Sequence, residues 1–296
     1  MSDLLQIKDY LKKIENCVDN LEKKTLLTQS AALLIGINYQ GTSSALKGCI
    51  NDVRCMKKML TQRFGMSSSR ILCLTDDLTG GESKPTRRNI LAGFDWLVEQ
   101  SRVQGCSSLW FHYSGHGTSR TDQSKDEADG KDECIVPSDF KFISDDEIHG
   151  RLVSLLSPGT SLVGFMDCCH SGTLLDLRYR YIAGTRHRIE NPKSKGEARV
   201  LVVSGCRDSQ TSSDACYGGE WSGAMTKFLI ATLEEADFEI TCYNLLRKLR
   251  NKLQQWGHTQ VPQLTCSQRL SGSSMFSSRE NSAAYLAASG DREPEN

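Results

Sequence analysis

Apolar runs of strand length alternate along the chain with amphipathic stretches of helix length. The apolar runs lie at 31–37, 70–75, 107–113, 161–166 and 199–204, and each is too uniformly apolar for a sheet with one face in water. Helices are expected between them, at 46–63, 86–104 and 144–156. Ser144 and the three acidic residues that follow it are typical of a helix start. This alternation predicts an α/β fold in which helices flank a mainly parallel central sheet.

The remaining segments define the expected organisation. Residues 1–28 are expected to be helical, because 4–21 carry a narrow apolar stripe that could dock on the protein's own surface or zip to a second copy. Residues 29–276 are expected to form one domain, with a large region to about 177, a linker at 178–199 and a small region at 200–276. The small region should hold helices near 222–235 and 241–256 and a strand at 260–266, before a polar, mobile tail at 277–296.

Charge is balanced over the whole chain but uneven along it. The 36 basic residues equal the 36 acidic ones, so no excess positive charge is available for nucleic acid or an anionic membrane. Residues 120–147 carry ten acidic and four basic side chains, whereas the linker carries seven basic and two acidic ones. The linker residues Arg178, Arg180, Arg186, Arg188, Lys193, Lys195 and Arg199 would be exposed to a protease if the segment were mobile.

Apolar length and cysteine spacing indicate the compartment. No apolar run approaches the ~20 residues of a membrane helix, and the first ten residues are too charged for a signal peptide. The twelve cysteines include no Cys-x-x-Cys and no zinc-finger spacing, so most are expected to be buried thiols. A cytoplasmic protein without nucleic-acid or membrane partners is predicted, and it is expected to be a monomer unless the stripe at 4–21 self-associates.

Reactive side chains follow two of the predicted strands. One strand ends in Ser114-Gly115-His116-Gly117, and another ends in Asp167-Cys168-Cys169-His170-Ser171-Gly172. The carboxyl ends of parallel strands meet at one edge of a sheet, which is where such folds place their chemistry. A thiol and an imidazole there suit a cysteine peptidase, with the Gly117 and Cys169 amides as oxyanion donors. The sequence contains no Gly-x-Ser-x-Gly, Walker or Gly-x-Gly-x-x-Gly motif, which disfavours serine hydrolases and nucleotide-binding proteins.

These two runs resemble the signature motifs of metacaspases, which are cysteine peptidases of the caspase fold. The similarity extends over about 33–276 and is supported by Gly36-Ile37-Asn38-Tyr39, by Leu46-Lys47-Gly48-Cys49-Ile50-Asn51-Asp52-Val53 and by Val261-Pro262-Gln263-Leu264. The order of regions resembles type I, without the Pro-rich segment common in that type. The resemblance implies that His116 is the catalytic imidazole and that Cys169, directly before His170, is the nucleophile. Two consecutive side chains at a strand end cannot both face His116, and the family pattern selects the second cysteine.

The resemblance also implies a substrate class and a cofactor. The positions that match the family's acidic pocket for the residue before the cut are Cys49, Asp52, Ser114 and Asp167. The positions that match its calcium ligands are Asp132, Asp145, Asp146 and Asp176, and carboxylate oxygens suit Ca²⁺ better than zinc.

The implied function is a calcium-activated cysteine endopeptidase that cuts proteins and peptides after Arg or Lys through a thioester acyl-enzyme. The basic residues of the linker predict, in addition, that the enzyme cuts its own linker. Two alternatives stay open. A catalytically silent scaffold would act through its N-terminal helix. A true caspase would cut after Asp, and would need Arg where Asp52 and Asp167 stand.

Overall fold

The structure is a computed structural model. It describes Lys12 and residues 30–77, 80–121, 131–169, 174–182, 188–190, 198–205, 214–217, 219–270 and 275–277. Apart from Lys12 and Ser277, the helix expected over 1–28 and the tail expected over 277–296 lie outside the described residues.

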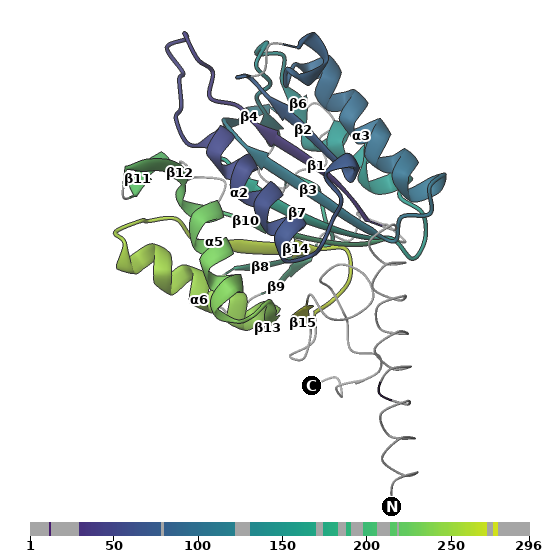
Figure 1. The fold of residues 1–296 in the computed structure, drawn as a ribbon, viewed down its shortest axis with the longest axis vertical. Coiled ribbons are helices and arrows are strands. Elements are labelled where there is room, and N and C mark those ends of the chain that lie inside the picture. Colours follow the sequence, from purple (N-terminus) through teal and green to yellow (C-terminus); the bar gives the residue numbers. More distant parts are fainter. Residues whose placement is uncertain are drawn as a thin grey trace, which may run out of the picture.

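An eight-stranded sheet forms the centre of the molecule, with strand order β2-β1-β3-β7-β10-β14-β8-β9 (Figure 1). Its strands are β1 (Ser30–Gly36), β2 (Ile71–Thr75), β3 (Ser108–Ser114), β7 (Ser161–Asp167), β8 (Tyr179–Ile182), β9 (Arg188–Glu190), β10 (Arg199–Ser204) and β14 (Gln263–Cys266). The first five strands in this order pair in parallel, and the last three add antiparallel pairs. The predicted mainly parallel sheet is confirmed, and strands from both sides of the expected linker share it.

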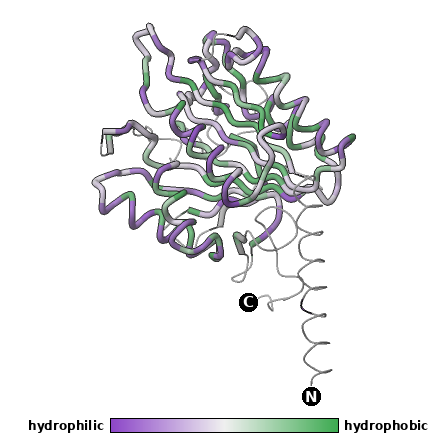
Figure 2. The backbone as a smooth tube through the Cα atoms, in the orientation of Figure 1, coloured by the Kyte–Doolittle hydropathy of each residue, from purple (hydrophilic) through white to green (hydrophobic). Residues whose placement is uncertain are grey.

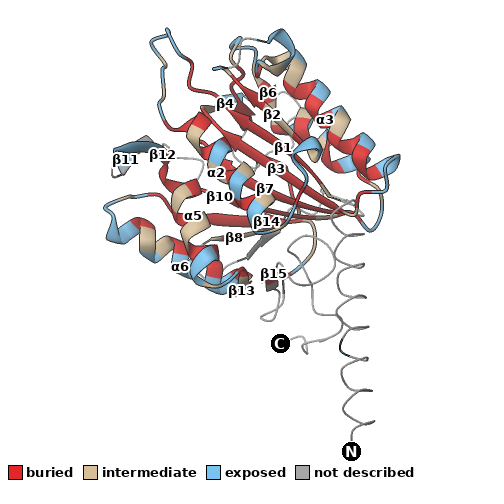
Figure 3. Cartoon of the chain, viewed as in Figure 1, coloured by how far each residue is buried: buried red, intermediate tan, exposed pale blue. Residues whose placement is uncertain are grey.

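Helices cover both faces of this sheet. The α-helices are α2 (Cys49–Gln62), α3 (Arg87–Arg102), α4 (Asp145–Arg151), α5 (Ala224–Glu235) and α6 (Cys242–Gln255), and the short 3-10 helices are η1 (Ser68–Arg70), η2 (Gly81–Ser83) and η3 (Val153–Leu155). One core lies between the sheet and α2, α5 and α6, and a second lies between the sheet and α3 and α4. Successive strand residues alternate between the two cores, so β1, β3 and β7 are buried almost throughout (Figure 3). Apolar residues accordingly concentrate along the central strands (Figure 2).

Helix starts agree closely with the sequence pattern. The hydroxyl of Ser144 accepts a hydrogen bond from the amide of Glu147 at 3.3 Å, which confirms the predicted start of α4. Helix α4 is shorter than expected, because it ends at Arg151 and the chain continues through η3.

The expected linker at 178–199 is not a simple connection. Most of its described residues form β8 and β9, which extend the central sheet beyond β14, and Arg199 begins β10. Tyr181 is buried in the core, and its hydroxyl accepts a hydrogen bond from the Leu270 amide at 2.9 Å. Residues 179–182 and 188–190 are therefore strands, which the interpretation of this segment as a linker did not include. The segment was interpreted from its basic residues. Its aromatic side chains at alternate positions, 179 and 181, pack on the core.

Three small sheets complete the described fold. They join β4 (Gly117–Thr121) with β5 (Lys131–Ile135) and β6 (Ile143–Ser144), β11 (Asp214–Tyr217) with β12 (Glu220–Gly223), and β13 (Glu239–Thr241) with β15 (Met275–Ser277). The ten cysteines in the described part of the chain are free thiols, as expected. Of the helices that the structure describes, none has both the length and the apolar character that crossing a membrane requires.

Candidate active site

Two turns meet where β3 and β7 end. These strands pair in parallel with Ser114 opposite Asp167, so His116 and Cys169 each lie two residues beyond the last paired position. The amide of Gly115 donates to the carbonyl of Asp167 at 3.3 Å. A Cβ at Gly117 would overlap the carbonyl oxygen of Cys169, so the turn that carries the imidazole packs directly on the backbone of the turn that carries the thiol. The structure therefore brings together the two residues that the sequence motifs singled out.

The imidazole of His116 is held on two sides by the loop that follows β1. Its Nε2 lies 2.8 Å from the carbonyl oxygen of Ser44, and the ring of Tyr39 lies against it with the centroids 4.7 Å apart. A carbonyl oxygen can only accept a hydrogen bond, so Nε2 carries the hydrogen in the neutral ring and Nδ1 is left as the basic nitrogen. The half-buried imidazole is thus fixed in one tautomer.

The two neighbouring cysteines have different environments. Cys168 is fully buried, and it lies close enough to the phenols of Tyr39 and Tyr113 that a charge on its sulfur would raise the pKa of both. Cys169 is only half buried. A substrate that arrives from solvent could therefore reach the thiol of Cys169 and not that of Cys168.

Asp52 lies on α2 and is completely buried. Its carboxylate accepts hydrogen bonds from the hydroxyl of Ser114 at 2.7 Å, from the hydroxyl of Ser222 at 2.5 Å and from the amide of Gly223 at 3.0 Å. Burial, followed by the negative charge of Asp167, raises the pKa of Asp52 well above its ordinary value. These donors are neutral, and no ion pair to Asp52 is seen among the residues that the structure describes.

Asp167 lies beside Asp52 and is also buried, with 3% exposure. One of its oxygens, Oδ2, accepts a hydrogen bond from the amide of Thr226, in the first turn of α5, at 2.8 Å. Gly223 lies between the two carboxylates, because a Cβ there would overlap Oδ2 of Asp167 and stand 2.7 Å from Oδ2 of Asp52. We refer to Asp52 and Asp167 as the carboxylate pair. A buried pair of this kind can attract a cation that approaches it.

Sequence reasoning found the carboxylate pair but not the residues that hold it. Ser222, Gly223 and Thr226 come from the end of β12 and the start of α5. Small and hydroxyl residues at a helix start have no distinctive spacing, and Ser222 lies 170 residues from Asp52. Cys49, the remaining predicted pocket residue, is buried in the first turn of α2, one turn before Asp52.

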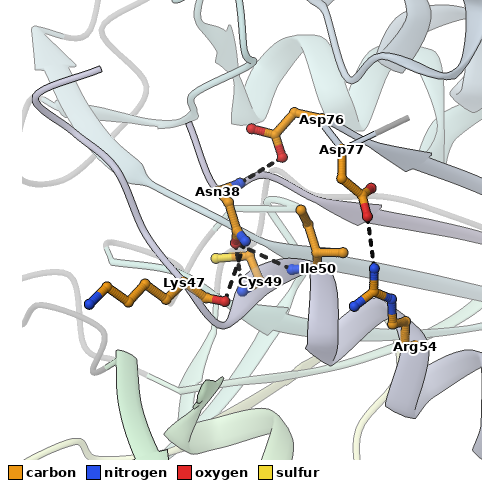
Figure 4. Close-up of polar contacts among 7 residues, drawn as sticks. All are labelled: Asn38, Lys47, Cys49, Ile50, Arg54, Asp76 and Asp77. Carbon is orange, nitrogen blue, oxygen red and sulfur yellow. Dashed lines mark hydrogen bonds and ion pairs between the residues drawn. The ribbon is translucent and has the colours of Figure 1, made fainter. Parts of the chain in front are cut away.

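Asn38 fixes the loop between β1 and α2 (Figure 4). Gly48, at the start of α2, has no side chain to cap the helix. Instead Oδ1 of Asn38 accepts hydrogen bonds from the amides of Cys49 at 3.0 Å and Ile50 at 3.4 Å, and its Nδ2 donates to the carbonyl of Lys47 at 3.3 Å. The Asn38 side chain thus links the start of the loop that carries Tyr39 and Ser44 to the end of that loop, where the helix that carries Asp52 begins.

Three of the four predicted metal ligands lie in β5 and at the start of α4. Asp132 is in β5, and Asp145 and Asp146 begin α4. Asp145 is buried, and its two oxygens accept hydrogen bonds from the amides of Glu133 and Asp146, both at 2.9 Å. Burial raises the pKa of Asp145 to about 7, and the charge of Asp132 adds to the effect. Glu133, which the sequence did not single out, is buried as well.

Asp176, the fourth predicted ligand, lies between β7 and β8, with a positive φ of 44°. Within the described ranges, no group of three or more His, Cys, Asp or Glu side chains is arranged to hold a metal ion. Both oxygens of Asp145 already accept hydrogen bonds from the backbone of β5 and α4, so a cation at Asp145 would compete with these contacts.

This chain is similar to known proteins both in sequence and in fold. Residues 30–178 match the model of the metacaspase, peptidase C14 domain. The metacaspase-1 of Ajellomyces capsulatus is 37% identical over 290 residues, which cover 81% of this chain and 80% of that protein. Among solved structures, a protein of Geobacter sulfurreducens matches with a TM-score of 0.59 at 22% identity, covering 82% of this chain and 95% of the other. Caspase-1 of Spodoptera frugiperda matches with a TM-score of 0.52 at 13% identity, covering 80% and 86%. The chain therefore belongs to the metacaspase family of cysteine peptidases.

Proposed function

We propose that this chain is a cysteine endopeptidase that cuts after Arg or Lys, with Cys169 as the nucleophile and His116 as its base. The observation that carries the proposal is the register of β3 and β7, which sets His116 and Cys169 at equivalent positions beyond two adjacent strands. Their contact through Gly117 and the half-buried state of Cys169 support it.

The reaction uses residues of this chain alone. Nδ1 of His116 accepts the proton of the Cys169 thiol, and the thiolate attacks the carbonyl carbon that precedes the scissile bond. The amides of Gly117 and Cys169 stabilise the oxyanion. The imidazolium then protonates the leaving amine, and water hydrolyses the thioester with the same imidazole as base. The carbonyl of Ser44, which holds Nε2–H, stabilises the imidazolium between these steps.

The carboxylate pair would determine the substrate class. A guanidinium that enters beside Asp52 and Asp167 would exchange its hydration water for contacts with two buried carboxyl groups. Its planar arrangement of N–H donors matches the two oxygens of a carboxylate. An Asp side chain would meet like charge in a desolvated place. This reasoning favours cleavage after Arg or Lys over cleavage after Asp.

We further propose that calcium activates the enzyme by binding near Asp132, Asp145, Asp146 and Asp176. Carboxylate oxygens are the ligands that calcium prefers, and a cation would favour the ionised form of Asp145, whose pKa is raised to about 7. Because both oxygens of Asp145 accept backbone hydrogen bonds, we expect calcium to compete with these contacts when it binds. No step of the reaction depends on the ion.

Self-cleavage is a third element of the proposal. Arg180 and Arg188 lie in paired strands, where the backbone is held in a ladder. We therefore expect the cut after Arg186, Lys193 or Lys195, which lie outside the described residues. A cytoplasmic location is consistent with the ten free thiols.

A fluorogenic peptide assay tests the function. Matched peptides with Arg or Asp before the reporter group are offered to wild type, Cys169→Ala and Cys168→Ala, each with calcium and with chelator. We expect hydrolysis of the Arg peptide by wild type, none by Cys169→Ala, and much of the activity in Cys168→Ala, because Cys168 is fully buried, away from an incoming substrate. A slow split of wild type during incubation, absent in Cys169→Ala, would report self-cleavage.

Three results would contradict the proposal. Equal loss in both cysteine variants would mean that Cys169 is not the nucleophile. Preference for the Asp peptide would favour a caspase-like specificity. Failure of wild type to hydrolyse either peptide, together with failure to react with an Arg-based thiol-reactive peptide, would favour a silent scaffold.

A further inference from the structure

Two tyrosine hydroxyls connect the peptide groups of His116 and Val136. Tyr39 Oη accepts a hydrogen bond from the His116 amide at 2.9 Å and donates to the Val136 carbonyl at 2.6 Å. Tyr113 Oη donates to the His116 carbonyl at 2.7 Å and accepts from the Val136 amide at 3.2 Å. Each hydroxyl thus donates to a carbonyl of one of these residues and accepts from the amide of the other, and the two oxygens lie 3.3 Å apart. The Val136 amide also donates directly to the His116 carbonyl at 3.2 Å, so the hydroxyls add to a backbone contact between the two segments.

The tyrosine pair is buried and stays neutral. Tyr39 is 2% exposed and Tyr113 is 0% exposed. Burial raises the pKa of both phenols above the ordinary value, so each keeps the proton that its carbonyl acceptor requires. Buried hydrogen bonds that are satisfied on every side hold their groups more rigidly than isolated ones.

The chain around the pair gives up conformational freedom to form it. Tyr39 has a φ of 49°, in the left-handed region that a bulky residue rarely adopts. A residue larger than glycine would not fit at position 115 without a shift of the tyrosines, because a Cβ there would stand 2.8 Å from Oη of Tyr113 and 3.0 Å from Oη of Tyr39. Two local costs, a strained tyrosine and an obligatory glycine, therefore accompany the hydroxyl pair.

The hydroxyl pair and the ring of Tyr39 hold different parts of His116. The pair binds the backbone amide and carbonyl, while the ring of Tyr39 contacts the imidazole at 4.7 Å. Position matters here because a displacement of about 1 Å of a catalytic group can cost roughly 100-fold in rate.

We infer that Tyr39 and Tyr113 act together as positioning residues that set the His116 imidazole toward the thiol of Cys169. The inference rests on the proposed function, since it assumes that His116 serves Cys169. The carboxylate pair is built from other residues, so the tyrosines should affect turnover and the ionisation of the thiol more than the binding of an Arg side chain.

The test compares Tyr39→Phe, Tyr113→Phe and the double variant with wild type. Tyr39→Phe keeps the ring on the imidazole and removes only the hydroxyl. Tyr181→Phe is the matched control, since it also removes a buried hydroxyl that accepts a backbone amide, on a strand separated from β3 by three others. Thermal unfolding confirms that each variant is folded before kinetics are measured.

Two readouts are taken on the full chain. The first is kcat and KM on the Arg peptide at saturating calcium. The second is the rate of alkylation at Cys169 by iodoacetamide as a function of pH, quantified by mass spectrometry with Cys169→Ala as the blank. The alkylation midpoint reports how far the imidazole favours the thiolate, and it needs no peptide hydrolysis.

The expected result is a kcat about 10-fold lower in Tyr39→Phe, a KM within about twofold of wild type, and an upward shift of the alkylation midpoint. Either single variant opens the same ring of hydrogen bonds, so the double variant should lose little more than Tyr39→Phe. Tyr181→Phe should match wild type in both readouts.

The inference is overturned if Tyr39→Phe keeps the wild-type alkylation midpoint, if Tyr181→Phe shifts it equally, or if the losses of the two single variants multiply in the double variant. If wild type hydrolyses no peptide, the proposed function fails, while the alkylation profiles still decide whether the tyrosines control the pairing of His116 with Cys169.

Discussion

Two sets of buried carboxylates lie in this molecule, and they are satisfied in different ways. Asp52 accepts hydrogen bonds from Ser114 and Ser222, which lie 62 and 170 residues away in the sequence. Asp145 accepts its hydrogen bonds from Glu133, 12 residues away, and from its neighbour Asp146. Asp52 therefore ties distant parts of the chain together, whereas Asp145 organises one strand and one helix start. A buried carboxylate with distant donors keeps its hydrogen bonds only in the assembled fold. A buried carboxylate with local donors can change partners at a smaller cost in free energy.

The largest expected effect is on Asp52. Replacing one partner of a buried charged contact costs roughly 2–5 kcal/mol, or about 30-fold to several thousand-fold in rate. Asp52→Asn and Asp52→Ala should therefore lower kcat/KM for the Arg peptide at least about 30-fold, without creating activity on the Asp peptide. Asp77→Asn is the control, because it removes an exposed ion pair with Arg54, which lies on the same helix as Asp52. Its kcat/KM should stay within about twofold of wild type. Wild-type kinetics in Asp52→Asn, with folding verified by circular dichroism, would show that the carboxylate pair does not bind substrate.

The second prediction concerns the local carboxylate. If Asp145 rearranges to bind calcium, Asp145→Asn should raise the calcium concentration for half-maximal activity by roughly 10-fold, with the maximal rate nearly retained. Asp139→Asn tests the same acidic stretch at an exposed carboxylate that accepts the Arg87 amide, and it should behave as wild type. The measurement is a calcium titration of peptide hydrolysis. Full wild-type activity in chelator would remove calcium from the mechanism.

A milder substitution keeps the Asp52 carboxylate and changes one of the side chains that donate hydrogen bonds to it. Ser222→Ala removes one of the donors to Asp52 and leaves Ser114 and Gly223 in place. Loss of one hydrogen bond to a charged group costs about 1.5 kcal/mol, so KM for the Arg peptide should rise by roughly 10-fold while kcat changes less. Ser222→Thr keeps the hydroxyl and should restore most of the affinity. Steady-state kinetics decide the matter, and an unchanged KM in Ser222→Ala would assign the support of Asp52 to the backbone alone.

The smallest effect is on the pH dependence of stability. The pKa of Asp52 is raised by burial and by Asp167, from an ordinary value of 3.8. Above about pH 4 the unfolded chain releases this proton and the folded chain retains it. The contribution of Asp52 to stability is therefore complete at low pH and is lost as the pH rises through the folded pKa. Urea unfolding of Asp52→Asn in chelator should show a smaller fall in unfolding free energy from about pH 4 to about pH 7 than wild type. An identical slope in the two proteins would mean that Asp52 is ionised in the folded state.

The difference between the carboxylates also explains what the sequence could predict. Asp167 is the last residue of the buried strand β7, and the strand-end rule was enough to place it near His116 and Cys169. The support from Ser222 and Gly223 could not be foreseen, because it depends on how β12 and α5 pack against α2. Asp145 was predicted as a metal ligand on family resemblance, whereas its place as the acceptor for the Glu133 amide follows from the pairing of two short strands, β5 and β6.

The same contrast holds for the fold. The long apolar strands and amphipathic helices were predicted within a few residues, because burial on both faces of a sheet leaves a strong pattern. The β4, β5 and β6 strands were missed because they are short and largely polar. Likewise β8 was interpreted as linker because arginines stand beside its tyrosines.

The position of β10 determines what a cut chain would become. β10 lies between β7 and β14, while β8 pairs with β14 and β9 pairs with β8. A break between Glu190 and Ala198 would leave the first fragment bound to the second along both sides of the antiparallel pair of β10 and β14, through β7 on one side and β8 on the other. The two fragments would share one hydrophobic core, so they should elute together on a native column and separate only in denaturant. The protein could then be produced as two separate chains that reconstitute one another. A cut would break the connection between β9 and β10 without removing a domain.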